Sequence, residues 1–347
     1  MKTLKCGSAQ ALIRYFYKLA RVVFVVLLFS SQLGCSNPVA FAPTPNAALK
    51  ELSGTQKTEV FTQDYVSKKL DIIFVVDNSG SMADEQRKMG DRISNFISTL
   101  YDVDWQIAIT TTDVSDGVYG LKGDFLTIAG TNGFILTPQT PNYLSAFQNT
   151  IVRPESYNCT GGCPSGDEQA LRAAMMAIDK RDTSNKGFFR NGADLGLLVL
   201  SDEDEMSSGP SQATHAEELL SQIDSIWQDS KQFFSFGVVI QPGDTNCLSQ
   251  QGGAGHYGTF VSHLVDLTGG LTGSICDTDY APTLGLIGDH ARHLLDNVLL
   301  KYTPVPDSVA VRFTPDFSSS ISVSGRRVYL NPPPPKSTMI EVLYTIR

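Results

Sequence analysis

The sequence is poor in positive charge. Its 347 residues hold 27 lysines and arginines against 36 aspartates and glutamates, a formal net charge of −9. Residues 1–35 contain five of the basic residues and no acidic one, so the rest of the chain carries 22 basic and 36 acidic residues, or −14. Because phosphate groups are bound through basic patches, this balance argues against a nucleic-acid partner. It is compatible with cation binding.

Several motifs of hydrolytic and nucleotide-binding enzymes are absent from the sequence. It contains no HExxH, no G-x-S-x-G nucleophile elbow and no phosphate-binding GxxxxGK[ST]. We therefore expect a protein that is not an enzyme. A metal-dependent hydrolase, in which carboxylates hold a metal that activates water, remains the less favoured alternative.

Cysteine is scarce outside the first 35 residues, where Cys6 and Cys35 lie. The four that remain are an even number, as expected in an oxidising compartment; they are Cys159, Cys163, Cys247 and Cys276. Three pairings are possible, and we favour Cys159–Cys163, a small loop, with Cys247–Cys276, which clips a longer one. A zinc site is the alternative, although the spacings do not form two CxxC knuckles.

The first 35 residues have the plan of a secretory signal peptide. A basic start precedes a short apolar run, Val22–Ser30, and a small residue precedes Cys35. The run is too short for a comfortable membrane span. The ending LGC resembles a bacterial lipobox, which implies that Cys35 is acylated and becomes the mature N-terminus, anchored in a membrane. Simple secretion and an uncleaved anchor are the alternatives, and all three export the rest of the chain. Ser36 stands where an inner-membrane lipoprotein would have aspartate, so we expect an outer-membrane lipoprotein.

The rest of the chain divides into three parts by composition and pattern. Residues 36–58 are rich in Pro, Ala, Ser and Thr and predict a flexible tether. In residues 59–303, apolar runs of strand length alternate with segments of helical spacing. The runs are Leu70–Val76, Trp105–Thr110, Asp194–Leu200 and Phe233–Ile240, and the helical segments include Met89–Leu100, Asp167–Lys180, Leu219–Trp227, Phe260–Leu267 and Leu284–Leu295. This alternation predicts an α/β fold, a doubly wound, mostly parallel sheet with helices on both faces.

Two smaller predictions concern β structure outside that sheet. Residues 123–137 contain two short apolar stretches separated by a turn, which suggest a hairpin or paired short strands. Residues 304–347 alternate apolar and polar residues between turns, so we expect a small antiparallel β module there. A strand from Val60–Tyr65 is a candidate to complete it.

Oxygen-bearing side chains follow the predicted strands. Asp77, Ser79 and Ser81 come after the first, residues 110–113 (Thr-Thr-Thr-Asp) after the second and residues 201–205 (Ser-Asp-Glu-Asp-Glu) after the third. Ligands bind outside the carboxyl ends of the strands in such sheets, and Mg²⁺ prefers carboxylate, hydroxyl and water oxygens. Alternate residues of an extended turn project to the same side, and Gly80 lets the backbone turn tightly. The pattern therefore predicts a cation site.

The Asp77–Ser79–Ser81 motif resembles the D-x-S-x-S motif of the von Willebrand factor type A domain and its metal-ion-dependent adhesion site. The resemblance covers roughly residues 70–300, with longer loops at 114–165 and 243–257, and Asp202 matches the family's later aspartate. Ser165 stands in the place of the family's threonine, and Glu203 replaces the usual glycine, which favours Ca²⁺ or alters the site. Signal, cysteine, A domain and β tail together resemble exported lipoproteins of Gram-negative bacteria.

The resemblance implies adhesion to a protein partner whose acidic residue completes the coordination of a bound Mg²⁺, with Ca²⁺ or Mn²⁺ as alternatives. The implied ligands are Asp77, Ser79, Ser81, Ser165 and Asp202, with Asp113 and Glu203 in support. A simple turn is the alternative for the motif, with Ser81 as a helix N-cap and Asp84 completing a capping box. Glu203, Asp204 and Glu205 are expected in a solvated loop. A metal that only stabilises the fold of an envelope protein is the alternative function.

Overall fold

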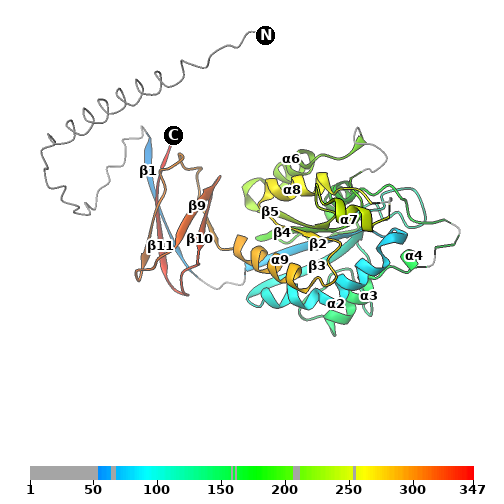
Figure 1. Ribbon diagram of the computed structural model, residues 1–347. Coiled ribbons are helices and arrows are strands. Elements are labelled where there is room, and N and C mark those ends of the chain that lie inside the picture. The colour runs from blue at the N-terminus through cyan, green and yellow to red at the C-terminus, as the bar shows by residue number, and fades with distance from the viewer. Residues whose placement is uncertain (1–53, 64–67, 158, 161, 206–211, 253–254) are drawn as a thin grey trace, which may run out of the picture. The chain divides into compact units, whose positions relative to one another are not determined.

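The computed structural model describes residues 54–63, 68–157, 159–160, 162–205, 212–252 and 255–347 (Figure 1). The predicted signal peptide, Cys35 and nearly all of the predicted tether lie outside these residues. No helix in the described part of the chain has both the length and the apolar character needed to cross a membrane.

A five-stranded parallel sheet forms the centre of the α/β domain. Its strands, in spatial order, are β3 (Val103–Thr111), β2 (Lys68–Val76), β4 (Ala193–Leu200), β5 (Phe233–Val239) and β6 (Thr272–Ser274). The side chains of β2 alternate between two hydrophobic cores, with Ile72 and Phe74 in one and Ile73 and Val75 in the other. A strand buried on both faces has to be apolar throughout, which explains the continuous runs in the sequence.

Helices cover both faces of the sheet (Figure 1). One core is closed by α2 (Ala83–Thr99), α3 (Tyr143–Ile151) and α9 (Ala281–Leu294), and the other by α5 (Ala170–Asp179), α6 (Ala216–Trp227) and α8 (Thr259–Thr268). Shorter elements are α4 (Pro154–Tyr157), α7 (Thr245–Gln250) and the 3₁₀ turns η1 (Gly80–Met82), η2 (Lys180–Asp182) and η4 (Gln228–Ser230). The predicted doubly wound α/β class is confirmed.

The direction of winding reverses at β2. The chain leaves β2 through α2 to its neighbour β3, and then crosses back to β4 on the other side of β2. The loops that leave a sheet at such a switch point diverge and open a crevice at the carboxyl ends of the strands. Asp77 follows β2 directly at this position.

The C-terminal β module is confirmed as two small antiparallel sheets. One contains β1 (Thr55–Thr62), β11 (Met339–Ile346) and β8 (Ala310–Thr314), and the other β7 (Asn297–Leu299), β10 (Arg327–Asn331) and β9 (Ser320–Ser324). Val328, Leu330, Ile340 and Val342 are among the residues of its core.

The predicted boundaries of the module differ from those in the structure. β1 begins at Thr55, inside the predicted tether of residues 36–58, and β7 lies before residue 304. Thr55–Thr62 is half exposed and has a weak strand signal, because its partner β11 is supplied by the far end of the chain. At each end of the α/β domain predicted for residues 59–303, one strand, β1 or β7, therefore belongs to the module.

The predicted hairpin in residues 123–137 is wrong. These residues form no strands, and a single backbone hydrogen bond, from Ile128 N to Gly133 O at 2.8 Å, joins the two stretches. The segment runs beside the outer edge of β3, where Leu126 N donates to Ile109 O at 2.8 Å and Leu136 exchanges two backbone hydrogen bonds with Ile107. The buried side chains of Ile128 and Leu136 hold the segment against the sheet. An uncovered edge strand is prone to pair with another chain, and this segment covers it.

Candidate functional site

Asp77 is buried at the carboxyl end of β2, with both carboxylate oxygens hydrogen-bonded. Oδ1 accepts from the backbone N of Ser79 at 2.8 Å, and Oδ2 accepts from the Ser201 hydroxyl at 2.7 Å. Its backbone N donates to Leu200 O at 2.9 Å, which continues the pairing of β2 with β4. The Asp77 carboxylate is thus fixed between the loops that follow these two strands.

A chain of hydroxyls joins this loop to Asp202. The Ser79 and Ser81 hydroxyl oxygens lie 3.0 Å apart, and Ser81 donates to Asp202 Oδ1 at 3.2 Å. The other carboxylate oxygen, Asp202 Oδ2, is buried and has no hydrogen-bond partner. Ser79 is half-buried and Ser81 is exposed, whereas the side chains of Asp77 and Asp202 are inaccessible. The site therefore opens to solvent on its hydroxyl side.

The alternative reading of the motif as a simple helix cap is wrong. The N-cap position of α2 is Met82, and no side chain caps the helix there. The Ser81 hydroxyl instead contacts Asp202, 121 positions further along the chain. A capping serine uses its oxygen on the first turn of its own helix, so the Ser81 side chain has a different role here.

Two buried polar residues hold the backbone of the Asp77 loop. Gln86 of α2 donates to Asp77 O at 2.7 Å and to the Ser156 hydroxyl at 2.9 Å, and that hydroxyl donates to Asn78 O at 2.9 Å. Since unpaired buried carbonyls are costly, these bonds satisfy the turn and fix its position. Neither Gln86 nor Ser156 was identified from the sequence.

The acidic run that begins at Asp202 is packed rather than solvated, which corrects the sequence-based prediction. Asp204 accepts hydrogen bonds from the backbone N of Thr259 and Phe260, the first residues of α8. Glu205 accepts from the first backbone N–H groups of α5, at 2.7 and 3.1 Å. Carboxylates at helix N-termini satisfy amides that have no partner within the helix and meet the positive end of its dipole.

Glu203, predicted as a supporting residue, is 8% exposed, and its Oε2 lies 3.7 Å from His256 Nδ1. Its backbone N donates to the Ser201 hydroxyl that holds Asp77. Glu203 thus lies beside the site.

Ser165 is placed next to the site but is not joined to it. Its backbone N donates to Asp113 Oδ2 at 3.0 Å, and its hydroxyl accepts from Asp167 N at 3.1 Å. Asp113 is buried and also accepts a hydrogen bond from Ser115 N, so it organises this loop. The structure brings together Asp77, Ser79, Ser81 and Asp202, and among the described contacts Ser165 has none with these four.

Glu168 lies close to the site and had no role in the sequence-based prediction. It is 1% exposed, its Oε2 accepts from the Thr112 hydroxyl, and its Oε1 has no hydrogen-bond partner. Thr112 follows β3, and its backbone N donates to Val76 O, immediately before Asp77. Thr112 lies in the polar segment after the second predicted strand and Glu168 in the predicted helical segment Asp167–Lys180, but nothing in the sequence indicates that they meet.

The site concentrates buried negative charge. Burial, and then the charge of Asp77, raises the pKa of Asp202 to about 7. Burial also raises the pKa of Asp77, and burial and the Asp77 charge raise that of Glu168 well above its usual range. Burying carboxylates together is unfavourable unless a proton or a cation compensates the charge.

The donor set fits a hard divalent cation. It consists of oxygen atoms only, one of them the buried, unpaired Oδ2 of Asp202. The set is mixed, with two carboxylates and two hydroxyls, and the described residues contain no group of three or more His, Cys, Asp or Glu side chains arranged to hold a metal. Mg²⁺, Ca²⁺ and Mn²⁺ accept such oxygen sets and complete them with water or a ligand.

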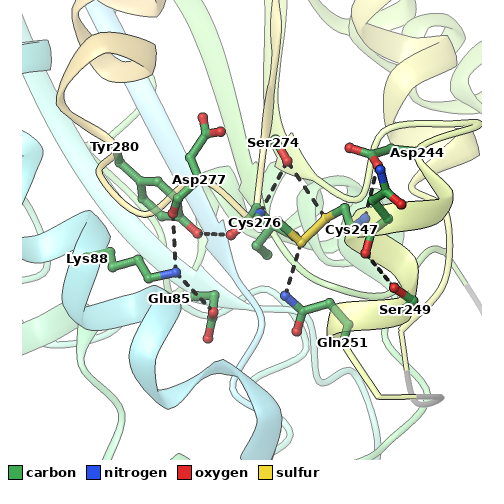
Figure 2. Close-up of a disulfide and its surroundings, with 12 residues drawn as sticks. Glu85, Lys88, Asp244, Cys247, Ser249, Gln251, Ser274, Cys276, Asp277 and Tyr280 are labelled. Carbon is green, nitrogen blue, oxygen red and sulfur yellow. Dashed lines mark hydrogen bonds and ion pairs between the residues drawn. A yellow bond between two sulfur atoms is a disulfide. The ribbon is translucent and has the colours of Figure 1, made fainter.

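Both favoured disulfides are present, so the cysteines do not form a zinc site. Cys159–Cys163 closes a small loop, and Cys247–Cys276 joins α7 to the segment after β6. Figure 2 shows the second bridge beside α2, where Lys88 Nζ donates to Asp277 O at 3.3 Å. Following α7, His256 N donates to Asp202 O at 2.9 Å. The bridged segments therefore border the site.

No family model matches the chain, and no curated protein matches it. Similar solved structures include the pilus adhesin SpaC of Lactobacillus rhamnosus GG, with 10% identity and a TM-score of 0.35 over 86% of this chain and 42% of that one. The manganese-loaded TRAP protein of Plasmodium vivax has 13% identity and a TM-score of 0.34, over 67% and 76% of the two chains. Proximal thread matrix protein 1 of the mussel byssus has 10% identity and a TM-score of 0.38, over 73% and 50%. This chain spans less than half the length of SpaC, and likenesses at these scores carry no argument about function.

Proposed function

We propose that this protein binds another protein through a divalent-cation site of the von Willebrand factor type A kind, centred on Asp77 and Asp202. The observation that carries the proposal is the pair of buried carboxylates bridged by the exposed hydroxyls of Ser79 and Ser81. The Asp202 oxygen without a partner adds to it.

Each residue has a defined task in this proposal. Asp77 and Asp202 supply negative charge from beneath, held by Ser201 and by the backbone around them. Ser79 and Ser81 supply neutral oxygens on the solvent side. A bound cation would supply positive charge that attracts an acidic side chain of the partner. The two carboxylates and two hydroxyls leave coordination positions of the cation open, and water or the partner's carboxylate would fill them.

We also propose that the protein is exported and anchored by a lipid on Cys35, as an outer-membrane lipoprotein. Two disulfides support export, because such bonds persist in oxidising compartments. Mass spectrometry of the protein isolated from membranes tests the anchor: a diacylated or triacylated N-terminal Cys35 is expected, and an unmodified, cleaved N-terminus would contradict it.

Calorimetric titration of the full-length protein with Mg²⁺, Ca²⁺ and Mn²⁺ tests the site. We expect Asp77→Ala to weaken binding by about a hundredfold or more, because it removes a buried anionic ligand. Asp84→Ala is the matched control, since this aspartate is on the first turn of α2 but is 70% exposed and paired with Arg87. Binding by the wild type that Asp77→Ala leaves unchanged would place the cation elsewhere.

A pull-down compares wild type with Mg²⁺, wild type with EDTA and Asp77→Ala with Mg²⁺. A partner retained only in the first condition supports recognition through the cation. Cation binding that raises the unfolding temperature, with the same partners retained in all three conditions, would instead favour a metal that only stabilises the fold.

A further inference from the structure

Glu168 has an unusual environment for a carboxylate. It is 1% exposed, and although Oε2 accepts a hydrogen bond from Thr112, Oε1 has no partner. The charges that act on it are all negative, those of Asp77, Glu203 and Asp113. A buried carboxylate is normally paired with a cation or with several N–H groups. The folded chain therefore compensates the negative charge of the Glu168 carboxylate only weakly.

The backbone holds Glu168 next to the proposed site. Thr112 N donates to Val76 O at 3.2 Å, and Gln169 N donates to Thr112 O at 3.2 Å. These two bonds tie the residue before Asp77 to the residue after Glu168, through the threonine whose hydroxyl holds the Glu168 carboxylate. The backbone position of Glu168 beside the Asp77 end of the site is thus set by three neighbouring segments, and the Thr112 hydroxyl holds its carboxylate.

Glu205 offers a contrast at the same end of α5. It is also 1% exposed, but both of its oxygens accept backbone hydrogen bonds from the first turn of the helix. Its oxygens are therefore used within the fold. Glu168 stands two residues before α5 and has no such use.

We infer that Glu168 is a third carboxylate of the cation site, which strengthens the binding of Mg²⁺ and Ca²⁺ through its negative charge from behind Asp77 and Thr112. This inference rests on the proposed function, since it concerns the same site. Electrostatic attraction between a buried carboxylate and a divalent cation is screened little by salt, so it acts even where the carboxylate is not itself a ligand. The protein would in this way hold its cation before any partner arrives.

The test is calorimetric titration of the full-length protein with Mg²⁺ or Ca²⁺ alone, without a partner. Glu168→Gln keeps the size of the side chain and an oxygen for Thr112, and we expect it to weaken binding of both cations by about tenfold or more because one charge is lost. Glu168→Asp keeps the charge and should retain affinity within about threefold. Asp296→Asn, the matched control, removes a buried carboxylate that pairs with Lys68 at the opposite end of β2, and should also stay within about threefold. Circular dichroism establishes that each variant is folded.

The outcomes separate this inference from the proposed function. A wild type that binds neither cation overturns the proposed function, and the inference with it. Cation binding that is the same in wild type and Glu168→Gln overturns the inference alone. If Glu168→Gln and Glu168→Asp weaken binding equally, the shape of the side chain and not its charge is responsible, and the inference is again overturned.

Discussion

Ser79 and Ser81 stand between the two buried carboxylates and solvent. Ser81 is the exposed member and is hydrogen-bonded to both Ser79 and Asp202. A neutral hydroxyl at this position costs little to bury under a cation and a partner, because it carries no charge to desolvate. Charge lies beneath the site and the uncharged oxygens lie at its surface.

Ser81→Ala should separate metal binding from folding. Because the residue is exposed and does not cap α2, we expect the free energy of unfolding to change by less than about 0.5 kcal/mol. Loss of one neutral ligand should weaken Mg²⁺ binding by about tenfold. Urea denaturation and calorimetry measure the two quantities on the same samples. A large loss of stability would mean that the Asp202 contact serves the fold instead.

At this scale the sequence predicts those residues whose spacing carries a pattern. Asp77, Ser79 and Ser81 form a local motif, and Asp202 follows an apolar run. Glu168 and Ser201 are single polar residues whose neighbours come from distant segments. Ser165 enters the predicted ligand set only through resemblance to the family, and its hydroxyl accepts a hydrogen bond from Asp167 N within its own loop. Such contacts depend on tertiary structure and have no periodic signal.

Asp204 and Glu205, which lie on the loop that follows Asp202, bind the N-termini of two helices. Asp204 accepts from the first amides of α8 and Glu205 from those of α5, so two helices packed on the same face of the sheet share this loop. A displacement of Asp202 would therefore disturb both N-termini. These bonds hold residues 204 and 205 in place and limit the movement of Asp202.

Glu205 makes the stability of the fold depend on pH, and the direction of this dependence follows from its raised pKa. Burial raises its pKa from 4.5 to about 7, so between these values the folded chain keeps a proton that the unfolded chain has lost. Stability therefore falls as pH rises through this range, by about 3 kcal/mol for this residue. In Glu205→Gln that contribution is absent.

The measurement is urea denaturation of wild type and Glu205→Gln in EDTA at pH 4.5 and pH 8. We expect the stability of wild type relative to the variant to be lower at pH 8 than at pH 4.5. Both proteins are measured at each pH, so the contributions of the other titrating groups cancel when the two free energies of unfolding are subtracted. A difference that does not depend on pH would show that Glu205 keeps the same charge throughout the range.

The sequence predicts elements well where burial on two sides forces a continuous apolar run, as in β2 and β4. It fails where a segment is half buried, as in residues 123–137, because their turn and apolar residues fit a hairpin and a covering segment equally. Asp71 shows another limit. This carboxylate lies inside the apolar run of β2, and its partner Arg190, which bonds both oxygens at 2.7 Å, is 119 positions away.

At the scale of the whole molecule, the two disulfides should contribute unequally to stability. Cys247 and Cys276 are 29 positions apart and Cys159 and Cys163 only four. In the chain-entropy model, these closures stabilise the fold by about 3.6 and about 2 kcal/mol respectively. Denaturation of the two double Cys→Ser variants tests this. The Cys247/Cys276 variant should be the less stable one, and the reverse order would show that the small loop has a further structural role.

Fold class and the separate β module follow from the sequence because each has its own period, near 3.6 and 2 residues. The boundaries of the module do not follow from the sequence, because β1 and β7 lie outside the segment that supplies the other four strands. β1 overlaps the predicted candidate strand Val60–Tyr65 at residues 60–62, whereas residues 55–58 look like a linker until their partner β11 is known.

The pairing of β1 with β11 also determines how the molecule bears tension. Suppose that residues before Thr55 are held at a surface while a partner pulls on the loop at Ser79. The covalent path between these points runs through β1, the connection at residues 63–67 and β2. Both strands are already almost fully extended, so detaching them would add little length, and a pull does work only through added length. The helices and both disulfides lie off this path. β1 and β2 would therefore each lengthen little under such a pull.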